Sequence, residues 1–70
     1  MKVKFLLDYV SLGQNIRIVF LDDNGDEVKT LGFENDRVYN SRPEIKEVLD
    51  MDVEYISSTE DDYLRIEVYE

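Results

Sequence analysis

The chain has 70 residues, and its 17 acidic residues outnumber its 8 basic ones, which gives a formal net charge of −9 at pH 7. This surplus of acid disfavours direct binding to DNA, RNA or anionic lipid, all of which require a basic surface. The sequence contains no cysteine and no histidine, so disulfides and sites that depend on thiolate or imidazole groups are excluded. We expect a single cytoplasmic domain over residues 1–70, near the smallest size at which an apolar core alone suffices.

Three antiparallel strands are predicted in the N-terminal half of the chain. Apolar and more polar residues alternate over residues 3–9, with the period of two that a half-buried strand shows. Further strands are predicted at 15–21 and 28–33, joined by Asn24 and Gly25, a pair typical of a two-residue type I′ hairpin. This hairpin and a four-residue turn at 11–14 place one apolar set on a single face, namely Phe5, Leu7, Tyr9, Ile16, Ile18, Phe20, Leu31 and Phe33. The three strands would then form a meander.

The C-terminal half is predicted to contain one short helix and a β-hairpin. Ser41 and Glu44 have the spacing of a capping box ahead of an apolar stripe, so a helix is expected over residues 42–50. Strands are expected at 53–58 and 63–69. A four-residue loop between them sets their register, which pairs Val53 with Val68, Tyr55 with Ile66 and Ser57 with Leu64. The element order is βββαββ, and the predicted fold class is α+β with a mainly antiparallel sheet.

The second face of the predicted meander is more apolar than a solvated sheet face should be. Its apolar residues include Leu6, Val19, Leu21 and Val28, with Leu6 beside Val19 and Leu21 beside Val28. Two interpretations stay open. Either the helix or the C-terminal hairpin covers this face within the domain, or these four residues form a dimer or target interface. The second interpretation predicts a homodimeric structural or assembly protein.

Neither metal binding nor catalysis is expected from the side chains available. The segment from Asp22 contains oxygen ligands of the kind found in a calcium loop, but an EF-hand requires Gly at its sixth position and Glu at its twelfth, where this chain has Glu27 and Phe33. The serines have no histidine to activate them. Carboxylates on solvated turns lack the unequal environments that acid–base catalysis requires. We therefore expect no enzyme activity, no cofactor and no metal.

Two acidic clusters are the main candidates for a functional surface. The first comprises Asp22, Asp23, Asp26 and Glu27 at the predicted hairpin tip, and the second comprises Glu60, Asp61 and Asp62 in the later loop. A negative field of this kind steers association with basic surfaces, whereas the competing interpretation is that the charge only maintains solubility. Glu54 and Glu67, predicted to face each other across two strands, would add a row of carboxylates that stands in for successive phosphates.

In charge and length, though in no motif, the chain resembles small acidic phage-encoded inhibitors, among them anti-restriction and anti-CRISPR proteins that mimic nucleic acid. Together with the two acidic clusters, this resemblance leads to the hypothesis of an acidic inhibitor of the DNA-mimic type. Such an inhibitor would occupy a basic nucleic-acid-binding surface of a target protein. The homodimeric assembly protein is the alternative hypothesis.

Overall fold

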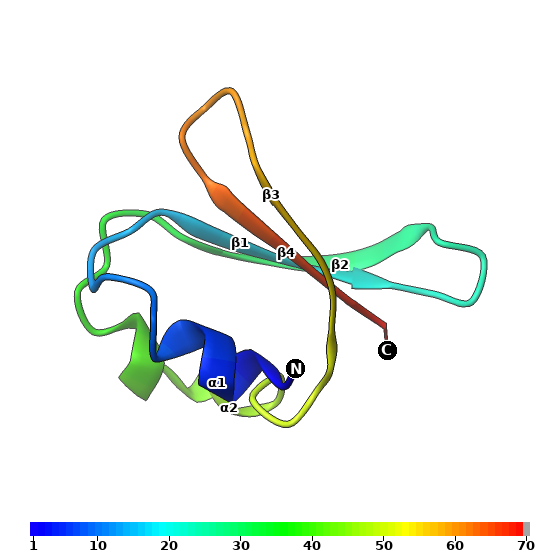
Figure 1. The fold of residues 1–70 in the computed structure, drawn as a ribbon, viewed down its shortest axis with the longest axis horizontal. Helices are drawn as coiled ribbons and strands as arrows, with labels where there is room; N and C mark the ends of the chain where they lie inside the picture. Colours follow the sequence, from blue (N-terminus) through cyan, green and yellow to red (C-terminus); the bar gives the residue numbers. More distant parts are fainter. Residues whose placement is uncertain (70) are drawn as a thin grey trace.

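A computed structural model describes residues 1–69, which form a four-stranded sheet with short helices on one of its faces (Figure 1). Along the chain the elements are α1 (Val3–Leu7), β1 (Ile16–Leu21), β2 (Glu27–Phe33), the 3-10 turn η1 (Tyr39–Ser41), α2 (Pro43–Lys46), β3 (Val53–Ser58) and β4 (Leu64–Tyr69). The strand order is β2-β1-β4-β3, with β1 parallel to β4 and the two outer pairs antiparallel. The predicted α+β class is confirmed, whereas the predicted meander is wrong.

The first predicted strand is in fact the helix α1. Phe5 and Tyr9, which the strand pattern placed in the core, are 52% and 89% exposed. The same segment also has the i, i+3, i+4, i+7 spacing of an amphipathic helix, at Val3, Leu6, Leu7 and Val10. These four residues pack in or against the core. A helix of five residues cannot stand alone, and backbone hydrogen bonds from its first two amides to the carbonyls of residues 49 and 51 hold it in place.

The β1–β2 hairpin keeps most of its predicted register, although its turn differs from the predicted type I′. Of the two central residues Asn24 and Gly25, only Gly25 has a positive φ, of 82°, and it ends a three-residue loop. Leu21 therefore pairs with Glu27 and not, as predicted, with Val28. A bulge at Val28 absorbs the extra residue. Beyond it the predicted pairs are confirmed, Ile16 with Phe33 and Ile18 with Leu31.

The helical segment of the C-terminal half is shorter than predicted. η1 precedes α2, and α2 ends at Lys46, so the helix expected over 42–50 forms only in part. The Ser41 hydroxyl donates to the Val38 carbonyl and caps no helix, so the predicted capping box is wrong. Ile45 and Val48 are nonetheless fully buried. The apolar stripe thus identified the packed face correctly, although not the extent of the helix.

The β3–β4 hairpin is shifted by one residue from its predicted register. The Thr59 N–H donates to the Tyr63 carbonyl and leaves residues 60–62 as a three-residue loop, in which Asp62 has a φ of 66°. The observed pairs are Ile56 with Ile66, Tyr55 with Glu67 and Ser57 with Arg65. Because a shift of one residue exchanges the two faces of a strand, Tyr55 and Ser57 lie on the face away from the core. A further irregularity near Glu54 restores the predicted pair of Val53 with Val68.

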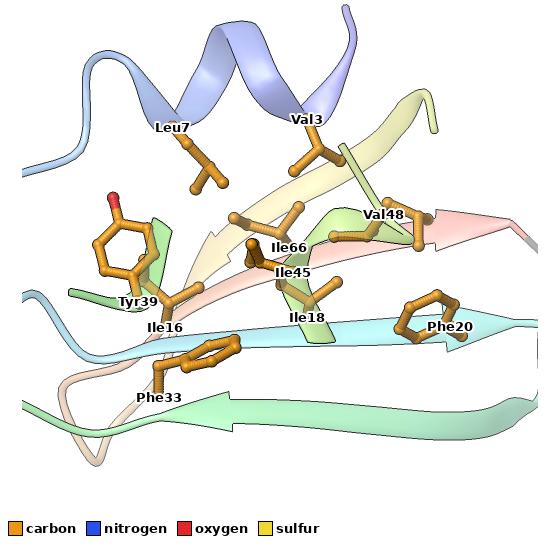
Figure 2. Close-up of a cluster of buried hydrophobic side chains, with 11 residues drawn as sticks. Val3, Leu7, Ile16, Ile18, Phe20, Phe33, Tyr39, Ile45, Val48 and Ile66 are labelled. Carbon is orange, nitrogen blue, oxygen red and sulfur yellow. The ribbon is translucent and has the colours of Figure 1, made fainter. Parts of the chain in front are cut away.

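The core lies between the helices and the inner face of the sheet (Figure 2). In the centre of the sheet, β4 takes the place beside β1 that the prediction gave to the N-terminal segment. The buried members of the core are Val3, Leu7, Ile16, Ile18, Phe20, Phe33, Tyr39, Ile45, Val48, Ile66 and Val68. They come from both helices, η1, the turn after α2 that contains Val48, and the strands β1, β2 and β4. One face of the sheet is thus covered by an apolar layer, and we call the other face the outer face.

Candidate functional site

Two residues of the outer face are buried although no helix covers them. Val19 is 0% exposed and Leu21 is 6% exposed. Both alternate along β1 with the core residues Ile18 and Phe20, so they point away from the helices. Figure 1 shows α1 and α2 together on the opposite side of the sheet. The cover of Val19 and Leu21 must therefore come from side chains of the outer face itself.

An ion pair of the outer face spans the strand that carries both residues, and Arg65 is its cation. Its Nη2 lies 2.7 Å from Glu27 Oε1, and its Nε lies 3.0 Å from Glu67 Oε2. Glu67 is on the same strand as Arg65, but Glu27 is on β2, and β1 lies between the two strands. The side chains of this pair therefore bridge β1, and the charged end of Arg65 lies between two carboxylates. The hydrogen bonds to Glu27 and then to Glu67 raise the pKa of Arg65.

A second charged cluster lies on the same face, at the start of β1. The Arg17 guanidinium lies 4.2 Å from the centroid of the Tyr63 ring and donates to Asp61 Oδ2 at 3.0 Å. The Thr59 hydroxyl donates to the other carboxylate oxygen of Asp61. The hydrogen bond from Thr59, and then that from Arg17, lower the pKa of Asp61 from its ordinary value of 3.8. Asp61 is thus held in place by the fold.

The four residues of the predicted dimer surface do not form one patch. Leu6 lies on α1 and packs against the core, on the other side of the sheet, so its predicted position beside Val19 is wrong. Val19 and Leu21 do share the outer face, but both are buried and present no apolar surface to a partner. Val28, at the bulge of β2, is 52% exposed. The apolar surface that the dimer hypothesis requires is therefore small.

The first acidic cluster forms the tip of the β1–β2 hairpin, and two of its four carboxylates are already bound by other groups of the chain. Asp22 Oδ1 accepts hydrogen bonds from the N–H groups of Asn24 and Asp26, both at 2.9 Å, and so shapes the turn. Glu27 pairs with Arg65. Asp23 and Asp26 are exposed and form no ion pair within residues 1–69. Their carboxylates therefore stand free at the tip.

The second acidic cluster lies at the opposite end of the sheet, so the structure does not bring the two together. Ile16 of β1 pairs with Leu64 of the parallel strand β4, so the loop that precedes β4 lies at the start of β1, whereas the first tip follows its end (Figure 1). At 3.3 Å per residue, the length of β1 corresponds to about 20 Å. Within the described part of the chain, Glu60 and Asp62 are exposed and unpaired, whereas Asp61 pairs with Arg17.

Pairing within the chain leaves the surface with a surplus of carboxylates. Within residues 1–69, the basic residues that form ion pairs outnumber those that do not, which are Arg37 and Lys46. Away from the outer face, the pairs are Lys2 with Asp52, Lys4 with Asp50, Lys29 with Glu47 and Arg42 with Asp36. The predicted row of carboxylates is wrong, because Glu67 faces Tyr55 and pairs with Arg65. Most of the carboxylates that form no ion pair within residues 1–69 therefore lie in loops and tips, and the exceptions are Glu44 on α2 and Glu54 on β3.

An open pocket of about 310 Å³ lies beside the second tip. It is lined by Tyr9, Val10, Ser11, Gln14, Ser58, Asp62, Tyr63 and Leu64, which belong to the α1–β1 connection and to the two ends of the β3–β4 loop. Tyr63 contributes both to this pocket and to the cluster around Arg17. The pocket is not predictable from a sequence pattern that places Tyr9 in a strand. Neither the ion pairs of Arg65 nor the cluster around Arg17 was predicted, although both residues alternate with core residues of a central strand and therefore lie on its other face.

The comparisons with known proteins add no constraint on this site. No family model, no curated protein and no solved structure matches the chain. Within residues 1–69, no group of three or more acidic side chains is placed to hold a metal ion. In the same part of the chain, no helix has the length and apolar character needed to cross a membrane. The function must therefore be argued from charge and geometry.

Proposed function

We propose that this protein is an acidic binding module that docks on a basic surface of a partner protein and inhibits it by excluding nucleic acid from that surface. The observation that carries the proposal is the position of the unpaired carboxylates. Asp23 and Asp26 at one tip, and Glu60 and Asp62 at the other, are exposed and form no ion pair within residues 1–69. Most basic side chains, in contrast, are consumed by pairs with other carboxylates.

The electrostatic consequence is a field that is negative at both ends of the sheet. Charges at a projecting tip are exposed to a partner before the rest of the surface is, and long-range attraction of this kind raises association rates with basic surfaces. The clusters around Arg17 and Arg65 support this arrangement, because they fix the strands from which the tips project. The partner then requires basic groups that match one tip, or two sets at least about 20 Å apart, since both tips project beyond the ends of β1.

The proposal is tested by capture of partners with charge-matched variants. The protein is immobilised and exposed to a bacterial lysate at about 0.1 M and about 0.5 M salt, conditions that differ strongly in screening. A basic nucleic-acid-binding protein should be retained at low salt, lost at high salt, and displaced by duplex DNA. The variant Asp23→Asn/Asp26→Asn, or Glu60→Gln/Asp62→Asn, should retain less of it.

A control variant separates the position of the charge from its amount. Glu34→Gln/Glu44→Gln removes the same charge at exposed positions outside both tips, so it should retain the partner as the unmodified protein does. Equal losses in all three variants would show that net charge alone is responsible. Retention that neither salt nor duplex DNA alters would contradict the proposal, since docking on a nucleic-acid-binding surface requires both effects.

A further inference from the structure

The pocket beside the second tip combines an apolar wall with a negatively charged rim. Val10 and Leu64 are apolar residues of its lining, and the aromatic residues Tyr9 and Tyr63 line it as well. Asp62 is the one lining residue whose side chain is charged at neutral pH. A volume of about 310 Å³ is at the lower end of the range for ligand sites, which suits one long side chain better than a larger molecule.

The chemistry of this lining favours a cation with an extended apolar stem. An ammonium or guanidinium group is attracted to the face of a tyrosine ring and to a carboxylate. Asp62 forms no ion pair within residues 1–69, and its carboxylate is exposed. An anion at the same place would be repelled by Asp62 and by the net charge of −9. Of the common side chains, arginine and lysine meet these requirements.

The neighbouring cluster shows how this loop already binds a guanidinium. The Arg17 group lies over the Tyr63 ring at 4.2 Å and donates to Asp61 at 3.0 Å. Asp62 is the next residue of the same three-residue loop, and its positive φ of 66° gives its backbone a different direction from that of Asp61. Of the three carboxylates in this loop, Asp61 binds within the chain, Asp62 lines the pocket, and Glu60 is exposed.

We infer that this pocket binds the guanidinium group of an arginine side chain from the partner, with Asp62 as its carboxylate and Tyr9 and Tyr63 as its aromatic contacts. Arginine suits the site better than lysine because its planar group stacks on rings and bonds carboxylates through two N–H groups. The identity of the ligand's source rests on the proposed function. The recognition of a guanidinium by the pocket does not.

The pocket is tested with a small probe and no partner protein. The isotope-labelled protein is titrated with N-acetyl-arginine amide, and amide shifts are followed by NMR. The neutral isostere N-acetyl-citrulline amide and the lysine derivative serve as matched ligands. We expect saturable shifts confined to the residues around the pocket, with a Kd of about 1–10 mM, as an exposed ion pair with cation–π contacts allows. Citrulline should bind at least about fivefold more weakly.

Two substitutions locate the contact. Asp62→Asn keeps a residue type that tolerates positive φ and should weaken arginine binding about fivefold or more. Asp23→Asn removes the same charge at the other tip and should change the Kd by less than about twofold. Tyr9→Ala alters a side chain that is 89% exposed and leaves the fold intact. It should weaken binding about two- to fivefold.

Several results would overturn the inference. These are shifts spread over both tips, equal effects of Asp62→Asn and Asp23→Asn, no loss in Tyr9→Ala, citrulline binding as well as arginine, or lysine binding better than it. No saturable shift at about 20 mM probe, twice the upper expected Kd, would also overturn it. Because the titration contains no partner, failure of the capture experiment leaves this result intact. A failed titration likewise leaves docking of the tips to be judged on its own test.

Discussion

The two faces of β1 reach the same burial by different means. Ile18 and Val19 are adjacent in the sequence, point to opposite sides of the sheet, and are both 0% exposed. Ile18 lies in the apolar core beneath the helices. Val19 lies on the outer face, where no helix covers the sheet and the ion pair of Arg65 on β4 with Glu27 on β2 bridges β1. Complete burial of a side chain therefore does not by itself identify a second structural layer.

The two kinds of cover should respond differently to the solvent. Apolar packing is insensitive to the screening of charges, whereas a pair of which one carboxylate is about half exposed weakens as salt rises. The outer face therefore makes the stability of the sheet depend on ionic strength, whereas the inner face does not. The same outer face orients both acidic tips, so this difference also concerns the proposed function.

The largest effect is expected on the inner face. Ile18→Ala removes a fully buried side chain from a core that cannot collapse freely, and should lower the free energy of unfolding by about 2–5 kcal/mol. Urea denaturation followed by circular dichroism measures the change, and it should be the same at low and high salt. Because a small domain could fail to fold, Ile18→Val provides a graded version, with an expected loss of about 0.5–1.5 kcal/mol. Losses below these ranges would show that the inner face is loosely packed.

An intermediate effect is expected for the cover of the outer face. Arg65→Ala removes the methylene stem and leaves Glu27 and Glu67 without their cation, and should cost about 1–2 kcal/mol. Arg65→Met keeps an apolar stem of similar length but no charge. It should recover part of the loss and abolish the dependence on salt, which urea denaturation at about 0.05 M and about 1 M salt would detect. If Arg65→Ala leaves stability unchanged, the burial of Val19 has another origin.

The two faces also explain which parts of the fold the sequence could predict. Alternation along β1 and β2 identified the inner-face pairs of Ile16 and Ile18 correctly, because apolar burial leaves a strong period of two. The outer face gave a misleading signal. Val19 and Leu21 were correctly predicted to be apolar residues on a second face. Arg65, however, follows Leu21 by 44 positions in the chain. No local pattern indicates that β4 would lie beside β1.

Short segments with two possible periods were the other source of error. Residues 3–9 fit a strand through Phe5 and Tyr9 and a helix through Val3 and Leu7, and only the docking on residues 49–51 decides between them. Loop chemistry was predicted in part. Gly25 takes a positive φ, as expected of Asn-Gly, while Asp62 does so without the glycine that would have signalled it. The pocket depends on the helix in place of the predicted strand at residues 3–9 and on the positive φ of Asp62, so sequence patterns alone could not predict it.

The smallest effect is expected when the pH is lowered in order to distinguish the contributions of the two faces to stability. The pKa of Asp61 is lowered by the Thr59 hydroxyl and then by Arg17, so the folded chain holds this carboxylate ionised below its ordinary pKa of 3.8. A lowered pKa in the folded state stabilises the protein above the unfolded pKa, and this contribution is lost as the pH falls through the folded value. The free energy of unfolding should therefore decrease as the pH falls below about 5.

Asp61→Asn isolates the contribution of the outer face to this decrease. The pKa values of Asp36, beside Arg42, and Asp50, beside Lys4, are also lowered, so the variant should retain part of the acid dependence but show a shallower slope than the unmodified protein. Ile18→Val should show the unmodified slope at lower overall stability, because it adds and removes no titrating group. Urea denaturation between about pH 2 and pH 6 covers the relevant range. A slope unchanged in Asp61→Asn would mean that Asp61 binds protons equally well in the folded and unfolded chain, and that its hydrogen bonds with Thr59 and Arg17 do not stabilise the fold.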